Sequence, residues 1–170
     1  MSDTAHAPFS VAALFAERAK ARHADQQAEE QLKRRQQEEL DTFKARLESF
    51  EVTPAHVDAV YSRIRRAFER GETELMITSF PSDFCSDSGR AISNAGAPPI
   101  TKPDPEKAPK DPDPDWLATL PAGGRRVYDY WKANMRPNGF TFSARIVDYP
   151  GGKPGDVGLF LGWPKDAPDV

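Results

Sequence analysis

The sequence predicts an α+β protein: a long N-terminal helix followed by a small domain of about three mainly antiparallel strands with two helices on one face. Three observations predict this class. Residues 10–50 contain neither Gly nor Pro and consist largely of helix-forming residues. Apolar residues recur with a helical period in residues 57–68 and 127–135, and they alternate as in strands in residues 73–80, 140–148 and 157–163. A run of helix and strand elements in this order favours a single layer of helices on one sheet.

The first segment, residues 10–52, is predicted to be one long amphipathic helix that could form a coiled coil, with Ser10 as its N-cap. At 1.5 Å per residue such a helix is about 60 Å long, so we expect part of it to project from the small domain. Its most apolar stripe contains Leu14, Ala21, Ala28, Leu32, Phe43, Leu47 and Phe50. Gln36 and Glu39 interrupt this stripe, and no strict heptad repeat is sustained.

Three interpretations of this helix remain open. It pairs with a copy of itself or with a partner helix, or it stands alone in water, supported by charge pairs four residues apart such as Glu29 with Lys33. In the third interpretation, the C-terminal domain covers Phe43, Leu47 and Phe50. The first interpretation predicts a protein partner or a homo-oligomer through residues 10–50.

A second helix is predicted to begin at Thr53-Pro54, an N-cap followed by a proline at the first helical position, and to end at Gly71. Its apolar side contains Val57, Val60, Tyr61, Ile64 and Phe68. In the strand that follows, Leu75 and Ile77 are expected on one face, with Met76 and Phe80 on the other.

The last two strands are predicted to form an antiparallel hairpin. Phe140, Phe142, Ala144 and Ile146 alternate with mostly polar residues, and Val157, Leu159, Leu161 and Trp163 share one face of the next strand. The loop between them is too short for a parallel crossover. Its glycines, Gly151, Gly152 and Gly155, indicate either a turn of unusual geometry or a backbone cradle for a ligand.

Two groups of arginines are candidates for binding phosphate or nucleic acid. Arg63, Arg66 and Arg70 lie on the polar side of the second helix. Arg125 and Arg126 fall in the first turn of the helix that Gly123-Gly124 precede, where positive charge is unfavourable. This position predicts an acidic neighbour, an anionic ligand or plain exposure to solvent.

The segment 82–92 has the strongest appearance of a catalytic site. Cys85 would be activated if it lay at the start of a short helix near Arg90, with Asp87 beside it. The spacing from Cys85 to Arg90 is one residue shorter than in the cysteine phosphatase loop, so that chemistry is not transferred. The alternative is a small buried cysteine. One cysteine excludes an internal disulfide and a multi-thiolate zinc site, and no metal or cofactor is expected.

The remaining regions complete the expected organisation. Residues 1–9 are predicted to be disordered, residues 53–163 to form the small domain with a disordered Pro-rich loop at 94–115, and residues 164–170 to form a tail. The net charge of −3 provides no chain-wide attraction to nucleic acid. No apolar stretch is long enough to span a membrane, so we expect a cytoplasmic protein without a membrane partner.

These observations favour a non-catalytic protein-interaction or assembly module in which the long helix mediates association. The alternative is a nucleic-acid or phosphate-ligand binder that uses the arginine faces. A cysteine-dependent enzyme with Cys85, Asp87 and Arg90 is the third hypothesis.

Overall fold

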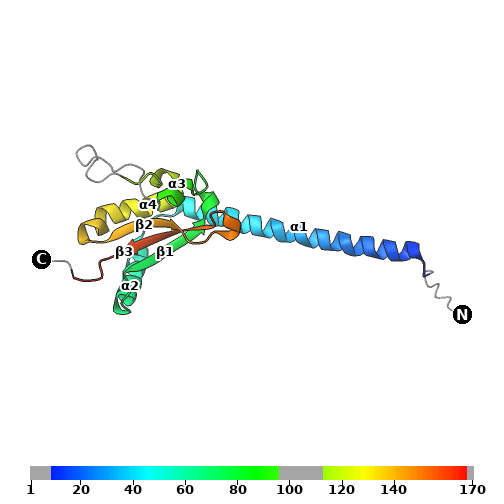
Figure 1. Cartoon of the computed structure of the whole chain (residues 1–170), viewed down its shortest axis with the longest axis horizontal. Helices are drawn as coiled ribbons and strands as arrows, with labels where there is room; N and C mark the ends of the chain where they lie inside the picture. The colour runs from blue at the N-terminus through cyan, green and yellow to red at the C-terminus, as the bar shows by residue number, and fades with distance from the viewer. Residues whose placement is uncertain (1–8, 96–112, 168–170) are drawn as a thin grey trace. The chain divides into compact units, whose positions relative to one another are not determined.

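The computed structural model describes residues 9–95 and 113–167 (Figure 1). Contacts divide the chain into two compact units, Met1–Phe43 and Lys44–Val170. Helix α1 (Val11–Ser49) crosses this boundary, so its last turn belongs to the second unit. The predictions of disorder at 1–9 and in the Pro-rich loop at 94–115 fall largely on residues 1–8 and 96–112, which, like residues 168–170, lie outside the described residues. The loop was predicted to begin too early, because Asn94 and Ala95 still belong to the helix Arg90–Ala95.

Helix α1 has nearly the predicted bounds. The Ser10 hydroxyl accepts a hydrogen bond from the Ala13 N–H at 3.1 Å, as expected of an N-cap side chain. Within Val11–Ser49 no residue is buried. The long N-terminal helix of the predicted fold is therefore confirmed.

Helix α2 (Pro54–Glu69) begins as predicted. The Thr53 hydroxyl accepts from the His56 N–H at 3.3 Å, and the His56 ring accepts from the Thr53 N–H at 3.2 Å. These reciprocal bonds form a capping box in which histidine replaces the usual glutamate. Gly71, with φ +81°, ends this segment in the left-handed region.

The apolar side of α2 was predicted too broadly. Only Ile64 and Ala67 are buried, whereas Tyr61 is 41% and Phe68 62% exposed. The packed stripe runs through Val57, Val60, Ile64 and Ala67, at spacings of three and four residues. The expectation that Phe68 is a core residue was wrong, because a helix buries a narrow stripe and position 68 lies beside it.

The sheet has the order β1-β3-β2, and both of its strand pairs are antiparallel. Its strands are β1 (Glu74–Pro81), β2 (Thr141–Ile146) and β3 (Asp156–Gly162). Phe142 lies opposite Leu161, and Ile146 lies opposite Val157, so the predicted antiparallel hairpin is confirmed. Val157, Leu159 and Leu161 on the central strand are at most 2% exposed.

An irregularity in β1 changes which residues face the core. The register shifts between Met76 and Thr78, leaving Ile77 as an extra residue in the manner of a β-bulge. Leu75 pairs with Leu161 and Phe80 with Val157, so both point to the core face. The prediction that Phe80 faces away from Leu75 was therefore wrong, because one extra residue reverses the alternation beyond it.

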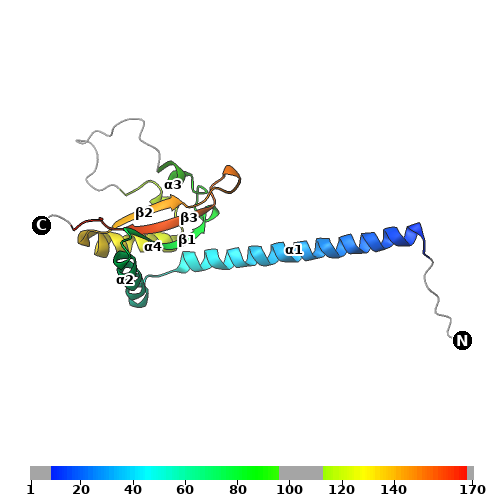
Figure 2. The same ribbon diagram turned by 60° about the horizontal axis from the view of Figure 1, so that its bottom comes forward.

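Helices α2 and α4 (Ala122–Tyr130) lie on one side of the sheet, as predicted (Figure 2). Gly123 and Gly124 are buried inside α4, not in its approach as expected. Helix α4 continues into a π-helical turn, Trp131–Met135. An aromatic cluster of Trp116, Tyr128, Trp131 and Phe142 joins these segments to β2, with ring centroids 5.3–6.0 Å apart.

Candidate functional site

The predicted cysteine site is part of the core. Cys85 is only 4% exposed. The Asp87 carboxylate accepts hydrogen bonds from the N–H groups of Gly89 at 3.0 Å and Ala91 at 2.8 Å, and so it caps α3 (Arg90–Ala95). Arg90 is exposed. The Asp87 carboxylate is thus engaged by backbone amides of the short helix and not by the Cys85 thiol.

The environment of Cys85 disfavours the thiolate. Burial and, to a smaller extent, the nearby negative charge of Asp87 raise the pKa of the thiol to about 11. A hydrogen bond with Thr119 acts in the opposite direction but does not offset burial. Since the thiolate is the nucleophile, this cysteine is poorly suited to covalent catalysis near neutral pH.

We expect native Cys85 to react with iodoacetamide far more slowly at neutral pH than in urea, as followed by mass spectrometry. The raised pKa of Cys85 also makes the free energy of unfolding depend on pH. The unfolded thiol ionises near its ordinary value of 9.0, so stability from this group is complete below pH 9 and is lost as the pH rises to about 11. The free energy of unfolding of Cys85→Ala, measured in urea, should not show this loss between pH 9 and pH 11. Rapid labelling of the folded chain would contradict the assignment.

Three of the five candidate arginines have partners within the chain. Arg63 Nη2 donates to the Met76 carbonyl oxygen at 2.9 Å, beside the irregularity of β1. Arg70 forms two 3.1 Å hydrogen bonds to the Glu72 carboxylate, which lower the pKa of Glu72. Arg126 Nη1 donates to the carbonyl oxygens of Glu48 at 2.8 Å and Phe50 at 3.0 Å. Arg66 and Arg125 are exposed. An anion site on these faces would therefore depend chiefly on Arg66 and Arg125.

The Arg126 contacts explain an arginine near the start of α4. Its charge lies on the carbonyls that end α1, where the helix dipole is negative. In return, the Glu48 carboxylate accepts from the Ala122 N–H at 3.2 Å, at the positive end of α4. Sequence reasoning missed this exchange, although the unfavourable position of Arg126 was a signal that it needed a partner.

The glycine loop forms a turn whose amides are used locally. Gly151 and Gly152 have φ of +62° and +80°, in the region that favours glycine. The N–H groups of Gly152 and Gly155 donate to the carbonyls of Tyr149 and Asp148 at 3.1 and 2.9 Å. The Gly155 carbonyl accepts from the Ser82 N–H at 2.9 Å. These groups hold the loop together and are not directed at a ligand.

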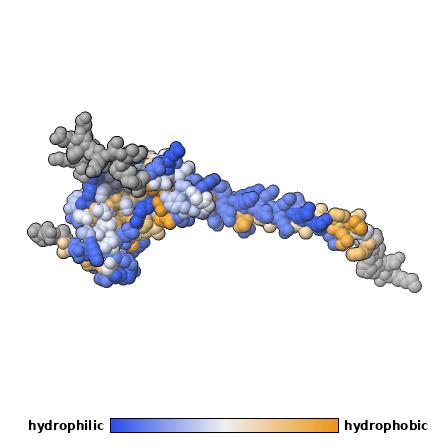
Figure 3. Space-filling view, in the orientation of Figure 1, coloured by the Kyte–Doolittle hydropathy of each residue, from blue (hydrophilic) through white to orange (hydrophobic). Residues whose placement is uncertain are grey.

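The first of two candidate sites is the exposed apolar surface of α1. Phe9 is 91%, Val11 68% and Phe15 57% exposed. Figure 3 shows apolar atoms gathered near this end of α1, followed by a mostly hydrophilic stretch. Further along, Leu32, Leu40 and Phe43 are exposed as well. Alanines are the only apolar residues in positions 16–31. The surface therefore consists of two apolar groups separated by a polar stretch.

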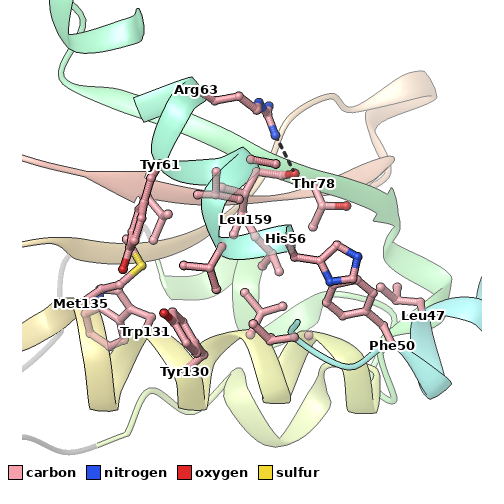
Figure 4. A pocket seen from close by; sticks show the side chains of 18 residues that line it. Leu47, Phe50, His56, Tyr61, Arg63, Thr78, Tyr130, Trp131, Met135 and Leu159 are labelled. Carbon is pink, nitrogen blue, oxygen red and sulfur yellow. Dashed lines mark hydrogen bonds between the residues drawn. The ribbon is translucent and has the colours of Figure 1, made fainter. Parts of the chain in front are cut away.

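The second candidate site is a pocket of about 330 Å³ between the last turn of α1, α2, α4 and the sheet (Figure 4). Most of its wall is apolar, including Val57, Val60, Val127, Trp131, Leu159 and Leu161. Its volume lies at the lower end of the range of small-molecule sites, about 300–1,000 Å³. The pocket can accommodate a small apolar molecule or side chain.

Polar groups are placed at separate points of this pocket. Tyr61 and Tyr130 are linked by a hydrogen bond that raises the pKa of Tyr130, with a smaller contribution from burial. Towards α1, the His56 ring packs against Phe50 with centroids 4.8 Å apart. Two hydroxyls and an imidazole could orient a bound polar group, but His56 also serves as the capping residue of α2.

Within the described residues, no three acidic, histidine or cysteine side chains are placed to hold a metal ion. None of the helices in these ranges combines the length and apolar character of a membrane span. Comparisons with protein-family models, curated proteins and solved structures find no match. The function must therefore be argued from the geometry of this chain.

Proposed function

We propose that this protein is a non-catalytic association module, in which α1 binds a helix of a second chain. The observation that supports it is the exposure of large apolar side chains along a helix with no buried residue. Large exposed apolar groups on a protein surface commonly mark interaction sites. The proposal places the protein in the cytoplasm, where its single buried thiol would remain reduced.

The sequence of α1 gives a second reason. A helix that only has to be soluble needs no large apolar residues, because Ala, Glu, Lys, Arg and Gln have higher or equal helix propensity. Val11 and Phe15 have lower propensity than these residues, and they are exposed in the described chain. Burying a large apolar side chain against a partner contributes about 1.5–3 kcal/mol, so association gives them a role.

We expect light scattering of the full chain to report a mass above that of one chain, falling towards it on dilution. Replacing both Leu14 and Phe15 by Ser should weaken association by about tenfold or more, because each loses its buried apolar area. The matched control, Gln26→Ser with Gln27→Ser, changes two polar residues of the same helix and should leave association nearly unchanged. A single-chain mass at all accessible concentrations would argue against self-association, and it would leave binding to a different helix to be tested.

The pocket supports a second candidate function, the binding of a small and mostly apolar molecule. Its volume, its apolar walls and the hydroxyls of Tyr61 and Tyr130 are the features that favour it. Such a ligand would contact the last turn of α1 through Leu47, together with both helices that cover the sheet.

This candidate is tested with the dye 1-anilino-8-naphthalenesulfonate, whose emission rises in apolar surroundings. Val127→Phe places a larger side chain in the pocket and should weaken dye binding by about tenfold or more, provided that the variant remains folded. Val147→Phe makes the same change at a position that is 45% exposed and should have little effect. Equal dye affinity in the two variants would place the dye elsewhere.

A further inference from the structure

Between residues 18 and 41 of α1, the charged residues are segregated by sign into consecutive blocks. Residues 18–22 and 33–35 contain only basic charges, and residues 25–30 and 38–41 contain only acidic ones. Each block has three charged residues. They are Arg18, Lys20, Arg22; Asp25, Glu29, Glu30; Lys33, Arg34, Arg35; and Glu38, Glu39, Asp41. From residue 18 to residue 41 the signs are therefore plus, minus, plus, minus, and the reversed order is minus, plus, minus, plus. Glu17, Lys44, Arg46 and Glu48 lie outside this segment of α1.

This order distinguishes the two ways in which two copies could lie side by side. In a parallel pair in register, each block faces a block of its own sign. In an antiparallel pair with residue 18 opposite residue 41, the block at 18–22 faces residues 41–37, and the block at 25–30 faces residues 34–29. Opposite charges then meet in every block, except that Glu29 and Glu30 of the two copies lie near each other at the centre. Charges on adjacent helices lie within the Debye length of about 8 Å at physiological ionic strength, so the difference is not screened away.

The apolar residues favour the same alignment independently. In this alignment the numbers of paired residues add up to 59, so Leu14 lies opposite Ala45 and Phe15 lies opposite Lys44. Phe43 is the next residue, and Leu40 is one helical turn away. The apolar group at one end of α1 thus meets the apolar group at the other end. Leu14 is 46%, Phe15 57% and Leu40 40% exposed, so these side chains have surface left to bury. The polar middle faces itself.

The alternation of charge along α1 does not by itself imply that two copies pair. It also places opposite charges four residues apart within one helix, as in Glu29 with Lys33, and such pairs stabilise a single helix. An isolated helix, however, has no requirement that its apolar groups be related by the same reversal as its charge blocks. Both patterns are satisfied at once by a two-fold axis between residues 29 and 30, and a closed two-fold pair is the commonest form of homo-oligomer.

We propose that α1 of two copies of this chain pairs in the antiparallel orientation about a two-fold axis between residues 29 and 30. The proposal rests on the association proposed above and specifies its partner as a second copy. In this pair the charge blocks select the antiparallel over the parallel orientation, in the same way that charged residues flanking the apolar seam select the orientation of coiled coils.

Disulfide cross-linking of the full chain tests the orientation. Ala21 and Ala28 are seven residues apart on one side of α1, and both are exposed. Position 28 lies close to the axis and faces residue 31 of the second copy, whereas the two copies of position 21 are separated by 17 residues, about 25 Å along the helices. A disulfide requires Cα atoms within about 7 Å, so Ala28→Cys should form at least about tenfold more linked dimer than Ala21→Cys. The unmodified chain, whose own cysteine is buried, is the blank.

A mixture of Ala21→Cys and Glu39→Cys chains should give linked heterodimers, although neither variant links to itself. Equal linking of Ala21→Cys and Ala28→Cys would indicate a parallel pair, which overturns the antiparallel inference and leaves the association module intact. A dimer by light scattering without linking at position 28 overturns the proposed axis. A single-chain mass with no linking overturns the self-pairing itself.

Discussion

Replacing Gly123 by alanine is expected to lower the free energy of unfolding by about 1–3 kcal/mol, as overpacking does in a filled core. A Cβ at this position would overlap the Leu47 carbonyl oxygen and would lie 2.8 Å from the Phe50 Cβ. The first of these atoms belongs to the backbone, so no side-chain rotation relieves the overlap. The last turn of α1 would have to move away from α4, straining the Glu48 and Arg126 hydrogen bonds. Urea denaturation followed by circular dichroism measures the loss.

The adjacent residue provides a matched control. A Cβ on Gly124, in the same helix, would have its nearest contacts with Leu120 at an ordinary 3.5 Å. Because alanine restricts the unfolded chain and favours helix, Gly124→Ala should be neutral or stabilise the protein by up to about 1 kcal/mol. If both variants had the same stability, the close contact between α4 and the end of α1 would be wrong.

Leu159→Ala is expected to destabilise the protein by about 2–5 kcal/mol, the range for removing a large aliphatic side chain from a core. Leu159 lies on the central strand, is fully buried and faces Ala144 on β2 and Thr78 on β1. Both neighbours are smaller than leucine, so they cannot fill the space that the truncation leaves. Denaturant unfolding monitored by tryptophan fluorescence measures the effect.

Phe68→Ala removes a larger side chain, yet the expected change is within about 0.5 kcal/mol, as for other surface positions. Phe68 is 62% exposed beside the packed stripe of α2. Comparing Phe68→Ala with Leu159→Ala tests whether burial or side-chain size determines the loss of stability. Side-chain size and hydrophobicity alone would predict the larger loss for Phe68→Ala. A loss at Phe68 similar to that at Leu159 would mean that this side chain is covered in solution.

Much of the fold followed from local patterns that a single element determines by itself. The absence of Gly and Pro from residues 10–50 predicted α1, and the Thr53-Pro54 pair predicted the start of α2. The period of two in the hairpin fixed its register, because a slip by one residue would exchange leucines for glycines in the core. The charge blocks of α1 were also present in the sequence, although their relation to a two-fold axis is a proposal.

The candidate sites were less predictable, because the role of a polar side chain depends on residues distant in the sequence. Arg63 and Arg126 resembled anion-binding residues until their partners, the carbonyls of β1 and of the end of α1, were known. Cys85 resembled a reactive thiol, and its burial depends on the packing of segments that periodicity does not place. The pocket could not be predicted either, since its wall combines residues from 47 to 161.

The sequence by itself determined the helices, the hairpin and the segregation of charge along α1, since each follows from propensity, caps and the alternation of neighbouring residues. Only the tertiary structure decided which side of α2 is buried and that the extra residue in β1 turns Phe80 towards the core. It also decided that the missing side chain of Gly123 lets the end of α1 pack closely against α4. The physical reason is that close packing depends on the shapes of several elements together, whereas periodicity describes one element at a time.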